Sequence, residues 1–137
     1  LHTLPNFKSH DIGVFVASLD LGRKYLENIF LVSNWTKPIN DHLQKVSVQF
    51  GTDLSGIRYE IVAPFGDNNP IESLLKQSKN TLNHVAYLVD DLDVSISRLK
   101  KERCLLISEP TPAIAFSNHR IAFLYTPLHF VIELIEN

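Results

Sequence analysis

Four polar side chains in strand-like apolar segments are the residues of this chain best suited to chemistry. Glu60 and Glu133 each lie in the middle of an apolar segment, and Asp11 and His84 each begin one. A carboxylate buried without a partner is very costly, so it pairs with another group, takes up a proton or binds a metal ion. If the segments fold into facing sheets, these four side chains can meet in one cleft.

The spacing of these residues indicates an internal repeat. Glu60 lies 49 residues after Asp11, and Glu133 lies 49 residues after His84. Residues 11–20 and 84–93 also correspond, because both read as an apolar strand and a short turn followed by Leu-Asp at the start of a helix. Matching order and spacing predict that one strand–helix–strand–strand–strand module is duplicated.

Hydrophobic periodicity places the elements of each half. In the first half we expect strands at 11–17, 31–36, 45–51 and 57–63 and a helix at 20–30. In the second half we expect strands at 84–90, 105–108, 119–125 and 129–135 and a helix at 92–103. Pro110 and Pro112 are expected to break the chain before the last strand pair.

The length of 137 residues predicts one domain over 1–137, and two βαβββ modules would place it in the α+β class. Its first βαβββ module covers 10–63, its second covers 83–137, and 64–82 form a linker rich in turn residues. A short helix at 71–77 is expected inside this linker, because Pro70 suits a first helical position.

Composition excludes several kinds of partner. The net charge of −2 gives no reason to expect nucleic acid or an anionic membrane. No apolar run reaches the ~20 residues of a membrane span, and the N-terminus lacks the pattern of a secretory signal. A single cysteine, Cys104, forms no intrachain disulfide, so we expect a cytoplasmic protein.

Three stretches of sequence resemble one known family. They are 60–71 (EIVAPFGDNNPI), 82–92 (LNHVAYLVDDL) and the pair 120–124 (RIAFL) with 131–134 (VIEL). In this order and spacing they resemble the vicinal oxygen chelate superfamily, which includes glyoxalase I, extradiol dioxygenases and bleomycin-resistance proteins. The most similar branch is that of methylmalonyl-CoA epimerases. The resemblance implies paired βαβββ modules in a curved mixed sheet around a cleft, and a homodimer.

The resemblance also implies four metal positions. The second, third and fourth fall on Glu60, His84 and Glu133. The family usually has His-Ile-Gly at the first position, whereas this chain has Asp11 before Ile-Gly and His10 one residue earlier. Strand alternation and the 49-residue spacing favour Asp11, and a bulge that turns His10 inward is the alternative.

Asp11 changes the character of the expected site. Three carboxylates and one imidazole favour Mg²⁺, Mn²⁺ or Co²⁺, while Zn²⁺ and Ni²⁺ stay open. Because Asp is shorter than His, weak or absent metal binding is a further alternative.

The resemblance implies an isomerase that removes a proton beside a metal-chelated carbonyl of a small acyl thioester or 2-oxo compound. Glu133 and Glu60 are the candidate bases. A glyoxalase-type lyase is a close variant. The alternative to an enzyme is a non-catalytic binding module that sequesters an antibiotic-like small molecule.

Several other residues receive a structural interpretation. The strand at 45–51 carries no acid that could serve as a second proton donor, and Gln49 is interpreted as a solvated strand residue. His119 and Arg120 are interpreted as a solvated turn, and Cys104 as a packing residue.

Overall fold

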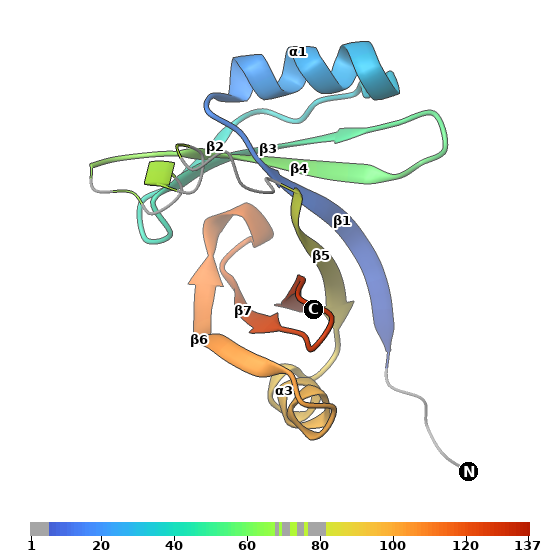
Figure 1. Ribbon diagram of the computed structural model, residues 1–137, viewed down its shortest axis with the longest axis vertical. Helices are drawn as coiled ribbons and strands as arrows, with labels where there is room; N and C mark the ends of the chain where they lie inside the picture. Colours follow the sequence, from blue (N-terminus) through green and yellow to red (C-terminus); the bar gives the residue numbers. More distant parts are fainter. Residues whose placement is uncertain (1–5, 68, 70–71, 74–75, 77–81) are drawn as a thin grey trace. The chain divides into compact units, whose positions relative to one another are not determined.

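The computed structural model describes residues 6–67, 69, 72–73, 76 and 82–137. The chain divides into two compact units. One unit is Asp11–Asn83, which we call the first module. The other combines His84–Asn137 with the N-terminal residues up to His10, and we call it the second module (Figure 1).

The first module is built on four strands and one helix. The order along the chain is β1 (Phe7–Phe15, which enters this module at Asp11), α1 (Leu19–Phe30), β2 (Ile39–Asp41), β3 (Val46–Thr52) and β4 (Arg58–Pro64). The strands lie in the order β2-β3-β4-β1. β1 runs parallel to β4, and the other neighbours are antiparallel. This is the βαβββ arrangement that the repeat predicts.

Helix α1 covers one face of the first module's sheet (Figure 1). Ser18 caps it, because its side chain accepts a hydrogen bond from the Leu21 backbone N–H at 3.2 Å. Leu26 packs from the helix onto Val32 and Ile61, all three being buried. Apolar burial of this kind holds a short helix in place, since an isolated helix of 12 residues is marginal in water.

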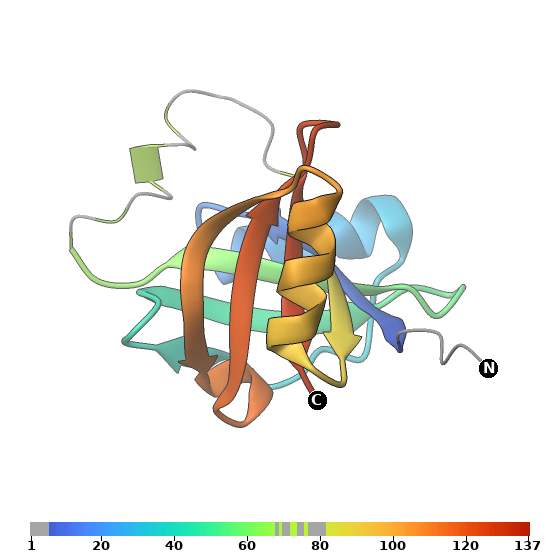
Figure 2. The same ribbon diagram turned by 90° about the horizontal axis from the view of Figure 1, so that it is seen from below.

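The second module repeats this arrangement. It contains β5 (Leu82–Val89), α3 (Leu92–Lys101), β6 (Leu105–Ala113), the short 3-10 helix η1 (Ile114–Phe116), β7 (His119–Tyr125) and β8 (Val131–Glu136). Its strands lie in the order β5-β8-β7-β6, with β5 parallel to β8. Figure 2 shows α3 lying along the sheet of β6, β7 and β8. Its core includes Val89, Leu92, Ile96, Cys104, Ala122, Leu124 and Leu134.

The strand registers of the two modules are the same. Phe50 lies opposite Glu60 in the first module, and Phe123 lies opposite Glu133 in the second. Each member of the second pair follows its counterpart by 73 residues. A slip of one residue would move every side chain to the other face, so this agreement confirms the internal repeat and the prediction of two βαβββ modules in the α+β class.

One predicted strand is wrong. Residues 31–36 were expected to pair, but the second strand of the first module is β2, at Ile39–Asp41. The 31–36 segment makes one isolated bridge, between Ser33 and Thr52, and Val32 is buried in the core. Its apolar pattern therefore reflects burial and not a strand ladder.

The interpretation of the two prolines is also wrong. Pro110 and Pro112 lie inside β6, which runs without interruption from Leu105 to Ala113. β6 ends the strand order, and its register shifts twice against β7. An edge strand with irregular pairing tolerates prolines, because their missing N–H groups face away from the ladder.

The expected linker helix at 71–77 lies mostly outside the described residues. Glu72, Ser73 and Lys76 are described and helical. Among the helices within the described ranges, none combines the length and the apolar character needed to cross a bilayer.

Candidate metal centre

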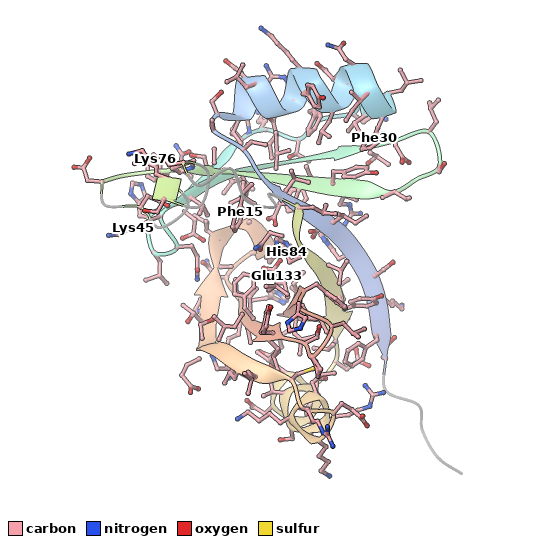
Figure 3. All side chains as sticks on the ribbon, viewed as in Figure 1. Phe15, Phe30, Lys45, Lys76, His84 and Glu133 are labelled. Carbon is pink, nitrogen blue, oxygen red and sulfur yellow. The ribbon has the colours of Figure 1, made fainter. Side chains whose placement is uncertain are left out.

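The second module holds an imidazole and a carboxylate side by side. His84 Nε2 lies 3.1 Å from Glu133 Oε1, and both side chains are 3% exposed. The register explains the contact. Glu133 of β8 lies opposite Ala86 of β5, and Ala86 has the same facing as His84 because the two are two residues apart on one strand. Figure 3 shows the two side chains together. At this distance the two groups can share a proton or bind one cation together.

The first module places two carboxylates in the corresponding positions. Glu60 of β4 lies opposite Gly13 of β1, two residues after Asp11, so Asp11 and Glu60 face the same side. Both are buried, at 6% and 4% exposure. The residue directly opposite each glutamate is small, Gly13 in the first module and Ala86 in the second. A small residue there leaves room for the polar side chains beside it.

Asp11 and Glu60 in the first module and His84 and Glu133 in the second are buried candidate metal ligands. Each offers one nitrogen or oxygen atom to an ion. Three ionised carboxylates and a neutral imidazole carry a charge of −3, which is costly to bury without a cation. This donor set therefore fits a divalent metal ion, and its oxygens favour a hard one.

His10, the alternative first ligand, has a different environment. Its ring packs edge-on against Phe116 at a centroid distance of 5.3 Å, within the second module. The buried group contains Asp11 at this position.

The nearest side chains of β3 and β7 on the same sheet face as the glutamates are apolar. Val48 and Phe50 share the face of Glu60, and Phe123 lies opposite Glu133 with its ring edge-on to His84 at 6.0 Å. Among the residues of β3, no acid accompanies the glutamate. These apolar walls exclude water from the polar groups, which strengthens their interaction with a charged ligand.

The interpretation of Gln49 as solvated is wrong. Gln49 is 5% exposed and lies on the sheet face that α1 covers. Its side-chain amide donates to the Thr36 carbonyl oxygen at 2.7 Å and accepts from Arg23 at 3.4 Å. It therefore ties the 31–36 segment to β3 and has no place at the metal centre. A polar residue flanked by Val48 and Phe50 in a strand was the available sign of burial.

Arg120 and His119 are engaged within the second module. Arg120 makes two hydrogen bonds to the Glu136 carboxylate, at 2.9 and 2.8 Å, and a longer one to Asp93 at 3.3 Å. The hydrogen bonds from Arg120 lower the pKa of Glu136. His119 Nδ1 lies 2.7 Å from the Glu136 carbonyl oxygen. These residues join β7 to β8 and are not the solvated turn that the sequence suggested.

Cys104 packs in the core of the second module, as expected. Burial, with a smaller contribution from Glu102, raises the pKa of its thiol. A buried thiol that resists ionisation is a poor nucleophile.

Comparison with known proteins places the chain among proteins of similar fold. Residues 10–123 match the family model described as the Glyoxalase/Bleomycin resistance protein/Dioxygenase superfamily. The chain is 27% identical over 119 residues to the mitochondrial methylmalonyl-CoA epimerase of Dictyostelium discoideum, covering 86% of this chain and 70% of that protein. It is 29% identical over 99 residues to the mitochondrial methylmalonyl-CoA epimerase of Bos taurus, covering 72% of this chain and 55% of that protein.

The similarity extends to a solved structure. The crystal structure of methylmalonyl-CoA epimerase from Mycobacterium tuberculosis superposes with a TM-score of 0.76 at 21% identity, covering 94% of this chain and 87% of that one. At this identity the likeness shows a shared fold.

Proposed function

Since the chain belongs to the Glyoxalase/Bleomycin resistance protein/Dioxygenase superfamily, we propose that it is a metal-dependent epimerase of a small acyl thioester of the methylmalonyl-CoA type. The observation that carries the proposal is that each module buries a pair of candidate ligands on one sheet face, Asp11 with Glu60 and His84 with Glu133. The names of the two curated relatives support the substrate class.

Each residue of the group has a role in this proposal. Asp11, Glu60, His84 and Glu133 would hold the ion. A divalent ion bound there supplies a Lewis acid for the thioester carbonyl, so that the neighbouring C–H becomes more acidic. His84, at 3.1 Å from Glu133, fixes the orientation of that carboxylate.

Glu133 and Glu60 are the proposed bases. Either would act as a base once released from the ion, because a free carboxylate in a low-dielectric site is more basic. Epimerisation requires removal of a proton from one face of the α-carbon and its return on the other face. Two carboxylates from equivalent positions of a repeated module are suited to this task, because each can serve one face.

The first test is metal binding. The metal-free protein is titrated calorimetrically with Mn²⁺, Co²⁺, Ni²⁺ and Zn²⁺, and we expect micromolar or tighter affinity for at least one ion. His84→Ala should weaken it by roughly 100-fold or more, because a first-coordination ligand is lost. His129→Ala is the matched control, since His129 is exposed in the turn before β8 and should leave the affinity unchanged.

The second test is proton exchange. In D₂O the loaded protein should incorporate deuterium at the α-carbon of methylmalonyl-CoA, and Glu133→Gln should slow this by about 10²–10⁴-fold, the usual contribution of a general base. Glu109→Gln, at an exposed position on β6, is the control. Absence of metal binding and of exchange would contradict the epimerase and favour the sequestering module, for which the aspartate at the usual histidine position is the specific sign.

A further inference from the structure

The first module carries one basic residue on the sheet face of its candidate ligands. Arg58 and Glu60 lie two residues apart on β4 and therefore face the same side. Of the residues that β1, β3 and β4 place on this face within the first module, Arg58 is the only lysine or arginine. Arg58 is exposed, whereas Glu60 is 4% exposed. The face therefore leads from a cation in contact with solvent to a buried carboxylate.

Arg58 also lies beside the second candidate ligand of this module. β1 and β4 run parallel, with Gly13 opposite Glu60. Two residues earlier on each strand, the same register places Asp11 beside Arg58, and both point to the face of Glu60. One guanidinium and two carboxylates thus share this face.

The second module has no cation at the equivalent position. Val131 follows Arg58 by 73 residues, and it lies opposite His84, where the first module has Asp11. β8 therefore carries an apolar side chain two residues before its glutamate, while β4 carries a guanidinium there. The repeated framework folds with either residue, so it does not require an arginine at this place.

The proposed substrate class explains why a cation is useful here. A thioester of the methylmalonyl type carries a free carboxylate on the carbon that loses its proton. The candidate donor set contains three carboxylates, which is more negative charge than one divalent ion neutralises. An anionic substrate is repelled by such a set unless a further positive charge lies near it.

We propose that Arg58 binds the free carboxylate of the substrate and so determines specificity for malonyl-type thioesters over simple acyl thioesters. This inference rests on the proposed function and adds the group of the substrate that is recognised. The planar guanidinium matches a carboxylate with two parallel hydrogen bonds. It has five N–H donors, so Arg58 can bind a substrate and keep a contact within the protein.

The position of Arg58 also suits the chemistry. Glu60, one of the two proposed bases, lies two residues away on the same face. Because the free carboxylate is attached to the α-carbon, holding it at Arg58 keeps the α-proton near this base. Correct placement of the reacting carbon is a large part of what an enzyme contributes to proton transfer.

The test compares malonyl-CoA with acetyl-CoA, two thioesters that differ only in this carboxylate. Their dissociation constants are measured calorimetrically on the full chain, with and without a divalent ion. We expect malonyl-CoA to bind at least ~10-fold more tightly, because only malonyl-CoA forms the charge-assisted pair with Arg58. Arg58→Gln should abolish this preference, and Arg58→Lys should keep part of it.

Two further variants complete the test. Arg58→Val, which introduces the residue found at the equivalent position of β8, should act like Arg58→Gln and decides the matter if that variant does not fold. Arg103→Gln is the matched control, because Arg103 is an exposed arginine of the second module and should leave the preference unchanged.

Three results would overturn the inference and leave the proposed function intact. They are equal affinity of the wild-type chain for both thioesters, a preference that survives Arg58→Gln and Arg58→Val, and a preference that Arg103→Gln reduces as much. A loss of ion affinity in Arg58→Gln, with the preference retained, would show that Arg58 only balances the charge of Asp11. Failure of the wild-type chain to bind either thioester would contradict the proposed function and this inference together.

Discussion

The two modules share one backbone plan but differ in the surfaces of their helices. Both helices begin with a side-chain cap, Ser18 for α1 and Asp91 for α3, and both lie over the sheet of their own module. Leu21, Tyr25 and Ile29 on α1 are exposed apolar residues. The equivalent positions 73 residues later hold Val94 and Arg98 on α3 and Glu102 at its C-cap. The duplicated framework therefore fixes the core, while the outer surface of each copy is free to change and to take on a separate role.

The same comparison applies to the candidate metal ligands. The first module supplies Asp11 and Glu60, and the second supplies His84 and Glu133, at equivalent register positions. The strands that carry them are alike, so the difference lies in one side chain, aspartate in place of imidazole. This change adds one negative charge and a hard oxygen donor to the ligand set.

Making the two halves alike should produce the largest change. Asp11→His gives both modules an imidazole and reduces the negative charge of the donor set by one. Because imidazole suits Zn²⁺ and Ni²⁺ better than carboxylate does, we expect the ratio of Zn²⁺ to Mn²⁺ affinity to rise at least about tenfold. Competition calorimetry on the metal-free variant measures this ratio, and an unchanged ratio would show that Asp11 does not contact the ion.

The helix–strand contact of each module gives a second, smaller test. Gly22 of α1 has Ser95 as its counterpart in α3. A Cβ at Gly22 would lie 2.6 Å from Val16 Cγ1, so Gly22→Ala should destabilise the protein by about 1–2 kcal/mol, although alanine favours helix. Ser95→Ala loses only the 2.7 Å bond to the Asp91 carbonyl and should cost less than about 1 kcal/mol. Urea unfolding of both variants reports the difference, and equal midpoints would contradict the close approach.

The smallest expected effect concerns an ion pair that only the second module has. Arg120 and Glu136 correspond to Ser47 and Ala63 in the first. Since Arg120 lowers the pKa of Glu136 in the folded state, the pair stabilises the protein above the unfolded carboxyl pKa near 4.5. This stability is lost as the pH falls through the folded pKa. Arg120→Ala should flatten the decline of the urea midpoint between neutral pH and pH 3, and Arg103→Ala, at an exposed position, should leave it unchanged.

Equal spacing made the repeat and the four candidate ligands predictable from sequence. The separation of Asp11 from Glu60 equals that of His84 from Glu133 because both modules use the same register, and identical registers bring equivalent side chains to equivalent places. Predictions that rested on the pattern of a single segment were wrong more often. Val32 has the pattern of a strand residue, but its burial comes from packing under α1.

Other features depend on context that no local pattern carries. Proline usually interrupts a strand, yet Pro110 is accommodated in β6 because β6 lies at the edge of its sheet. Which strand lies at the edge is set by the order of all the strands. Gln49 is buried because α1 supplies Arg23 beside it, 26 residues away. The exposure of Leu21, Tyr25 and Ile29 on α1 was not foreseen either, because what packs against a helix decides which of its apolar residues are covered.

The solitary thiol of Cys104 has a practical consequence. With 7% exposure and no second cysteine in the chain, it should react slowly with maleimides and methanethiosulfonates. The unmodified protein should therefore take up very little of such a label. Two cysteines introduced at open sites, such as Leu54 and Leu128, would take spin labels selectively, and pulsed dipolar spectroscopy could then follow the separation of the labels as substrate is added.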